Sequence, residues 1–186
     1  MLPPGLGFIS VSAKAWKLVE ASKTGRYYLD LRKAKKAADK NDTPFTSSIT
    51  LIDALNEALK IMQKDGLEYI FKRHKTMADA TRAAAKALGL ELFAPTAASD
   101  GVTAVKVPAA LDGEKLVKTM RDTYGVTIAG GQDELKGKVF RIAHMGYIAE
   151  SDIITGLACL EKVLTQMGYK FILGAGVAAA EEVFLK

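Results

Sequence analysis

The spacing of apolar residues predicts a helix in the first half of the chain. Ile52, Leu55, Leu59 and Met62 recur at three- and four-residue intervals, as they do along one face of a helix. The pattern begins near Ile49. It follows a turn at Asn41-Asp42-Thr43-Pro44, where the proline disfavours helical geometry in the residue before it. We therefore expect a loop and then a helix.

A second helical pattern starts after Gly66 and stops at Gly89. Its apolar positions again share one face of a helix: Tyr69, Ile70, Met77, Ala80 and Ala84. Nearer the start of the chain, Ser12 is a suitable N-cap for a helix that includes Trp16 and ends near Gly25. A turn at Pro3-Pro4-Gly5, followed by a short apolar strand around residues 8–11, is expected before that helix.

From Leu90 onward the period changes from helical to alternating. Residues 90–93 and 102–107 alternate as a half-buried strand does, and residues 126–129 and 139–142 are further short strands. Asp112 is placed to cap a helix that Gly125 ends. Another helix starts near Ser151 and stops at Gly168, with one apolar stripe formed by Ile153, Leu157, Leu160, Leu164 and Met167. This order predicts an α/β fold, a small and mostly antiparallel sheet covered by helices.

Composition narrows the class of protein without naming a function. The chain has 186 residues, of which 49% are hydrophobic and 25% charged, which is typical of a globular protein. Charged residues and glycines interrupt every apolar run, so we expect no membrane span. The net charge of +5 suits an anionic ligand or a nucleic acid. The basic residues gather in segments 26–40 and 72–75 without interleaved aromatics, however, and a solvated helical face explains them better.

Cysteine and histidine offer no metal site. Cys159 is the only cysteine, which excludes an internal disulfide and favours a reducing compartment, the cytoplasm by default. His74 and His144 are far apart in the sequence, and neither has a partner at metal-ligand spacing. The run Gly174-Ala175-Gly176-Val177-Ala178-Ala179 matches a dinucleotide-binding turn, but no βαβ unit follows it before Lys186. A terminal helix that starts at glycine is the better interpretation.

Arg141 is the strongest candidate for a binding residue. Side chains alternate along a strand, so Phe140 and Ile142 share one face and Arg141 points to the other. A guanidinium offers a planar fork that matches a carboxylate with two parallel hydrogen bonds. From the residues alone, an ion pair with a local acid is an equally good explanation.

Thr43 and Thr46 are candidates for binding a phosphate. Both carry hydroxyls beside Pro44, just before a helix whose first turn has unpaired backbone donors. Plain capping of that helix is the alternative.

Three blocks of sequence, taken together, resemble a known family. They are Pro3-Pro4-Gly5-Leu6-Gly7-Phe8, then Thr43-Pro44-Phe45-Thr46, then the stretch from Gly130-Gly131-Gln132 to His144-Met145-Gly146 that contains Arg141. In order and spacing they resemble the class V aminotransferases of the alanine:glyoxylate and serine:pyruvate group. These enzymes are fold-type I proteins that depend on pyridoxal 5'-phosphate. The resemblance covers essentially the whole chain.

The resemblance implies a fold and a division of the chain. Residues 1–88 would form the tail of the large cofactor-binding domain with its connecting helices, and residues 89–186 the small C-terminal domain. The first block follows the Schiff-base lysine in the family. The lysine is therefore expected just outside this chain, and the chain alone is expected to be inactive.

The resemblance also implies roles for individual residues. Arg141 would bind the substrate α-carboxylate, and Thr46 and Thr43 would contact the cofactor phosphate of the neighbouring subunit in a homodimer. A tyrosine often occupies the Thr43 position in the family, so Thr46 is the firmer assignment. The implied activity moves an amino group between alanine or serine and glyoxylate or pyruvate. The alternative is a non-catalytic α/β binding or structural module derived from this fold.

Overall fold

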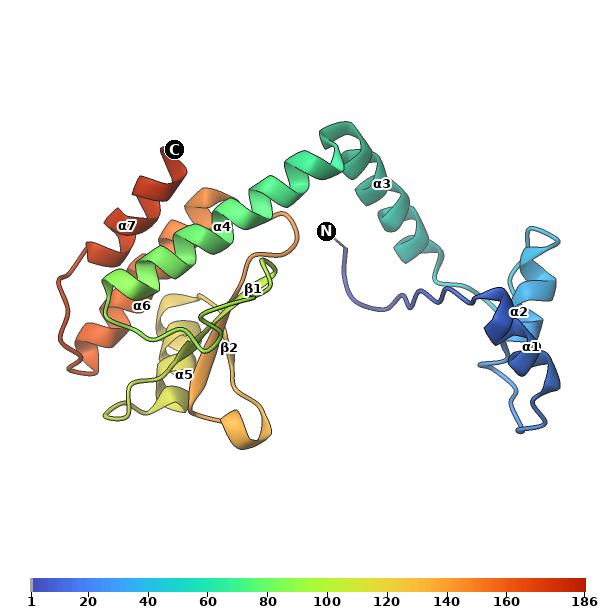
Figure 1. Ribbon diagram of the computed structural model, residues 1–186, viewed down its shortest axis with the longest axis horizontal. Helices are drawn as coiled ribbons and strands as arrows, with labels where there is room; N and C mark the ends of the chain where they lie inside the picture. Colours follow the sequence, from blue (N-terminus) through green and yellow to red (C-terminus); the bar gives the residue numbers. More distant parts are fainter. Residues whose placement is uncertain (1) are drawn as a thin grey trace. The chain divides into compact units, whose positions relative to one another are not determined.

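The computed structural model describes residues 2–186 and divides into two compact units, one ending at Ile61 and the other covering Met62–Lys186 (Figure 1). The division falls inside helix α3 (Ile49–Asp65). The predicted boundary at residues 88 and 89 concerns the domains of the complete protein, and it stays a prediction.

The first unit is helical. It contains α1 (Ala13–Ala21), α2 (Leu31–Ala38) and most of α3. Ser12 caps α1 as predicted, because its hydroxyl accepts a hydrogen bond from the backbone N–H of Ala15 at 3.2 Å.

The strand predicted around residues 8–11 does not form. The described part of the first unit contains no strand with which it could pair, and an unpaired strand leaves its backbone groups without partners. Phe8 and Ile9 are instead exposed, at 74% and 72%. A short apolar run after a turn was therefore not sufficient to predict a strand here.

The second unit is built around a three-stranded antiparallel sheet. Its strands are β1 (Val102–Lys106), β2 (Ala129–Gly130) and β3 (Val139–Ala143), in the spatial order β1-β3-β2. The small antiparallel sheet predicted from the alternation is thus confirmed. Two of its predicted strands are shorter than expected, because only residues 129–130 reach β3 and only Leu92 of residues 90–93 pairs, in an isolated bridge with Val105.

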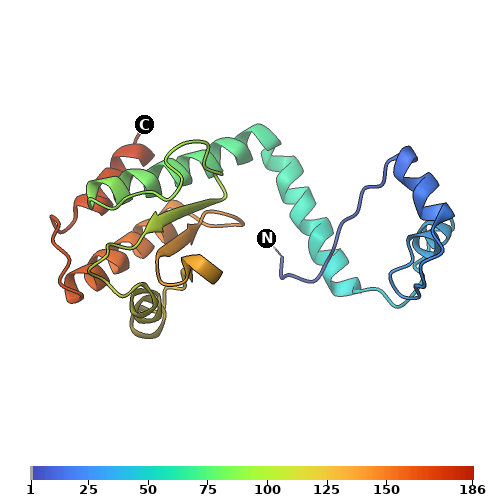
Figure 2. The ribbon, with the colours of Figure 1, turned by 60° about the horizontal axis from the view of Figure 1, so that its bottom comes forward.

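Helices complete the second unit, and most of their bounds match the sequence prediction. They are α4 (Leu67–Ala87), α5 (Gly113–Tyr124), α6 (Glu150–Gln166) and α7 (Ala175–Phe184), with a short 3₁₀ helix at Asp133–Leu135. Asp112 caps α5 by accepting hydrogen bonds from two backbone N–H groups, and Gly125 ends it in the left-handed conformation at φ +68°. The fold is the predicted α/β layer (Figure 2).

One face of the sheet carries the core. Val105 and Phe140 are fully buried there against residues of three helices, among them Leu88 of the α4 end, Met120 of α5 and Leu164 of α6. Behind this layer, α7 packs against α4 and α6 through a second cluster, whose buried members are Met77, Ala80, Ala84, Ile153, Leu157 and Ala180. Three of these are alanines, and small side chains let the helix backbones approach closely. The opposite face of the sheet is left for Arg141.

Among the residues that the structure describes, no helix is both long and apolar enough to cross a membrane.

Candidate functional site

Arg141 lies on the central strand of the sheet, on the face opposite the core. Its direct neighbours in the ladder are Ala104 on β1 and Ala129 on β2. Both are small, so neither side chain fills the space above the guanidinium. Phe140, the residue before Arg141, is fully buried on the other face, as the alternation predicted.

The guanidinium of Arg141 is anchored at one nitrogen only. Its Nε donates a hydrogen bond to the backbone oxygen of Gly130 at 3.0 Å. Within residues 2–186 the structure records no acidic partner for Arg141, so the local ion pair considered from the sequence does not form there. The arrangement leaves the two terminal nitrogens to bind a carboxylate end-on, through two parallel hydrogen bonds.

A tight turn holds the oxygen that anchors Arg141. The backbone N–H of Gly131 donates to Val139 at 2.9 Å, which brings the turn back onto β3. A Cβ at Gly131 would lie 1.9 Å from the backbone oxygen of Leu135, so only glycine fits. Of the Gly130-Gly131 pair, singled out in the sequence as part of a motif, Gly131 is therefore required by packing beside Arg141, whereas a Cβ at Gly130 would meet only Val117 at 3.9 Å.

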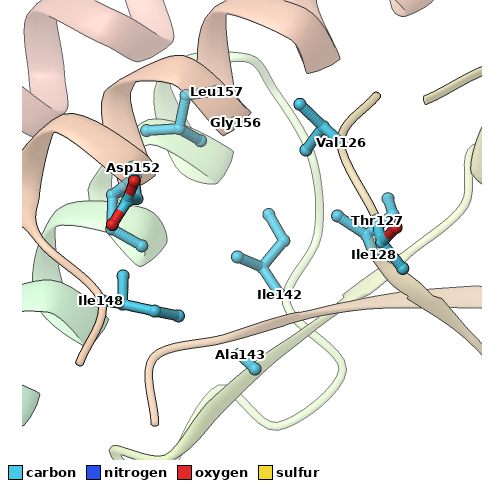
Figure 3. A pocket seen from close by; sticks show the side chains of 10 residues that line it. Val126, Thr127, Ile128, Ile142, Ala143, Ile148, Asp152, Gly156 and Leu157 are labelled. Atoms are coloured by element: carbon cyan, nitrogen blue, oxygen red, sulfur yellow. The ribbon is translucent and has the colours of Figure 1, made fainter. Parts of the chain in front are cut away.

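A pocket of about 220 Å³ lies on the other side of β3, between the strands and α6 (Figure 3). Ile142 points into it from the sheet, and Gly156 and Leu157 line it from α6. The lining is aliphatic apart from Thr127 and Asp152, and the Asp152 carboxylate accepts a hydrogen bond from the backbone N–H of Ala149 at 2.8 Å. Since Arg141 and Ile142 face opposite sides of the strand, this pocket is separate from the guanidinium.

Thr43 and Thr46 lie in the first unit, both exposed, in the turn before α3. Thr43 donates its hydroxyl proton to the backbone oxygen of Phe45 at 2.8 Å, and so stabilises the turn. A phosphate needs donors, and this proton is already used. Among the described residues the Thr46 hydroxyl is exposed and has no recorded partner, so its proton is not already used.

Aromatic packing holds this turn in place. The ring of Phe45 lies 5.5 Å from that of Tyr27 and 4.8 Å from that of Tyr28, centroid to centroid. The ammonium of Lys33 lies 4.1 Å from the centre of the Tyr27 ring. The threonines and Arg141 belong to different units, so the roles assigned to them from the sequence stay predictions.

His144 is buried, which the sequence did not indicate. The side chain is 1% exposed, and its Nδ1 lies 3.2 Å from the backbone oxygen of Asp100. Burial lowers its pKa from the ordinary value of 6.5, because desolvation disfavours the charged imidazole. His74 contacts the oxygen of Ile70 in its own helix, and the described residues contain no group of three or more potential metal ligands.

Glu161 was also missed by sequence reasoning. This α6 residue is only 2% exposed, and its carboxylate accepts hydrogen bonds from the backbone N–H groups of Gly174, Gly176 and Val177. The glycine-rich turn that resembled a dinucleotide site thus binds a carboxylate of its own chain at the start of α7. The terminal helix that we expected there is confirmed.

Comparison with known proteins identifies relatives along nearly the whole chain. No family model matches. The chain is 48% identical over 186 residues to a protein of Anabaena cylindrica named soluble hydrogenase 42 kDa subunit. It is 38% identical over 184 residues to the L-aspartate–glyoxylate aminotransferase of Paracoccus denitrificans. Further relatives are named serine–glyoxylate aminotransferase and pyridoxamine–pyruvate transaminase.

A solved structure shows the same fold. The pyridoxamine–pyruvate aminotransferase of Mesorhizobium loti matches 94% of this chain with a TM-score of 0.86 and 32% identity. The match covers 46% of that protein. The relatives are likewise covered in part, since the chain spans about half of their length, 48% for the Anabaena protein and 46% for the Paracoccus enzyme.

Proposed function

Because this chain belongs to the class V, fold-type I aminotransferases and corresponds to the C-terminal half of their fold, we propose that the complete protein is an aminotransferase. It would move an amino group between a small amino acid, alanine or serine, and an oxo acid, glyoxylate or pyruvate. The observation that carries the proposal is the anchored guanidinium of Arg141. Its Nε is bound to the backbone oxygen of Gly130, and its neighbours across the ladder are two alanines, Ala104 and Ala129.

Arg141 would bind and orient the substrate. Its Nε is fixed by Gly130, so the plane of the guanidinium is set before a substrate arrives. Two parallel hydrogen bonds to the α-carboxylate then fix the plane of that group as well as its position. A preset donor pair also loses less rotational freedom on binding than a flexible lysine would. The role of this half of the protein is therefore to present one face of the amino or oxo acid to the reaction centre.

The cofactor proposed is pyridoxal 5'-phosphate, as the relatives' family implies. When bound, it supplies the aldehyde and electron-accepting ring that amino-group transfer requires. Thr46, with a hydroxyl that is exposed beside the start of α3, fits the phosphate as a hydrogen-bond donor, and Thr43 contributes less. We further propose that this contact is made across the boundary of a homodimer.

The resemblance also supports two statements about the catalytic lysine and the activity of these residues. The cofactor-binding lysine would not be among the lysines of residues 1–186, and those residues alone would not transaminate. A separate observation, the single and free cysteine Cys159, fits a reducing compartment, and we propose a cytoplasmic location.

A transamination assay on the complete protein tests the proposal. The protein, supplied with pyridoxal 5'-phosphate, is incubated with alanine, serine or aspartate together with glyoxylate or pyruvate, and the new amino acid is quantified. We expect at least one pair to be turned over. Absence of turnover with every pair, in a preparation that retains the cofactor, would favour the non-catalytic module. Reduction of a redox dye by H₂ gas, without transamination, would instead favour a hydrogenase activity, which the names of two relatives state.

A further inference from the structure

The end of β3 is tied to the loop before β1 by His144. The backbone N–H of His144 donates to the oxygen of Gly101 at 3.0 Å, and its imidazole Nδ1 lies 3.2 Å from the oxygen of Asp100. A carbonyl oxygen only accepts hydrogen bonds, so Nδ1 carries the proton and donates it. The second ring nitrogen, Nε2, is buried without a partner among the described residues.

Arg82 of α4 holds the same loop from the other side. Its guanidinium donates to the carboxylate of Asp100 at 3.0 Å and to the backbone oxygen of Ser99 at 2.8 Å. Arg82 is itself largely covered, with 17% of its side chain exposed. Asp100 thus links α4 to the imidazole of His144, and the three residues form one connected brace.

The strand needs this brace because it is supported unevenly. Up to Arg141, β3 is paired on both sides, with β1 and with β2. Beyond Arg141 the ladder continues only to β1, and the other side opens onto the apolar pocket lined by Ile142 and Ala143 (Figure 3). Arg141 is therefore the last residue of β3 held from both edges, three positions before His144.

We propose that His144 is a positioning residue for Arg141. By fixing the singly paired end of β3 to the Ser99–Gly101 loop, it keeps the guanidinium in the place where it binds the substrate carboxylate. This inference rests on the proposed function, since it needs Arg141 to bind a carboxylate. His144 itself touches neither substrate nor cofactor in this account.

Two substitutions in the complete protein separate the hydrogen bond from the bulk of the ring. His144→Phe keeps the volume and removes the donor, whereas His144→Asn places an amide donor near the position of Nδ1. We expect His144→Phe to weaken glyoxylate binding, measured by calorimetry, roughly three- to tenfold, a range usual for substitutions that act on a site through other residues. KM for the oxo acid should rise by the same factor with kcat nearly unchanged, and His144→Asn should restore most of the affinity.

The kinetic pattern distinguishes positioning from loss of folded protein. Partial unfolding lowers kcat in proportion to the active fraction and leaves KM unchanged. His74→Phe is the matched control, because His74 bonds only within α4, and it should leave glyoxylate affinity at the wild-type value. Equal glyoxylate affinity in wild type and His144→Phe overturns the inference, with or without turnover. Absence of turnover in a wild-type protein whose glyoxylate affinity does respond to His144→Phe overturns the proposed function alone.

Discussion

Arg141 and Phe140 are adjacent in the sequence and have opposite environments. Alternation along a strand accounts for this, and it allowed the face of Arg141 to be predicted from residues 140–142 alone. The hydrogen bond from Arg141 to Gly130 was not predictable, because it depends on a turn that brings residues 11 positions apart together. Local pattern sets the direction of a side chain, whereas its partners depend on tertiary structure.

The burial of His144 shows the same limit. In the sequence His144 lies just after the predicted strand 139–142, and no neighbouring residue indicates that its ring is buried. Its Nδ1 contacts the loop at Asp100, which is bound in turn by Arg82 of α4, and both segments are distant in the chain. Only a three-dimensional structure brings these segments together.

Burial of His144 makes the stability of the second unit depend on pH. Its pKa is lowered in the folded state, so the unfolded state takes up the proton first as the pH falls through 6.5. The unfolded state then binds more protons than the folded state, and the free energy of unfolding decreases toward acid pH. Three charged or titratable groups act on the imidazole: Asp100 favours its charged form, whereas Arg82 and His74 oppose it.

We expect His144→Asn to reduce this acid-side loss of stability. The measurement is urea unfolding of the chain between pH 7.5 and 5, compared with wild type. The control His74→Asn keeps the burial of His144 and removes only the smallest of the influences on its pKa, so most of the wild-type decline should remain. Identical slopes in His144→Asn and wild type would show that His144 titrates alike in both states.

At the scale of elements, helices were predicted more consistently than strands, of which residues 102–107 and 139–142 match β1 and β3 but the others are shorter than predicted or absent. Helices α3, α4, α5 and α6 show their apolar periodicity within a single segment of sequence. Residues that begin or end a helix, such as Asp112 and Gly125, are also local. A strand requires a partner elsewhere, so the apolar residues 8–11 do not form one and residues 126–129 pair only at their end. The pairing of a strand with its partner cannot be predicted from the sequence of one segment.

Helix α7 is attached partly through one side chain of another helix. The Glu161 carboxylate lies at the positive end of α7 and accepts three of its backbone or flanking N–H groups. Glu161→Gln replaces one acceptor oxygen by an NH₂ group that faces these donors. We expect the free energy of unfolding to fall by about 2 to 3 kcal/mol, the upper range for hydrogen bonds to charged groups.

Chemical denaturation of the chain measures that change. Glu182→Gln is the matched control, because Glu182 is exposed on α7 and the same substitution there should change stability by less than about 0.5 kcal/mol. A loss of stability that is equal in the two variants would mean that the Glu161 contacts do not stabilise the docking of α7.

At the scale of the whole molecule, the 186 residues of this chain correspond to about half the length of their relatives. The sequence blocks predicted the family, and the relatives and the solved structure confirm it. The relation between Thr46 and Arg141 was not predictable, since the two residues lie in separate units.

The most direct test of the central claim is a single-turnover experiment on the complete protein. The absorbance of bound pyridoxal 5'-phosphate is followed after addition of alanine or serine, in wild type, Arg141→Lys and Thr46→Val. Lysine keeps the charge of Arg141 without its planar fork, so loss of the charge-assisted pair, about 1.5 to 3 kcal/mol, should lower the efficiency of the reaction roughly ten- to hundredfold. Cofactor affinity should be unchanged in Arg141→Lys and reduced in Thr46→Val. Wild-type efficiency in Arg141→Lys, or loss of its cofactor with substrate affinity intact, would contradict the account.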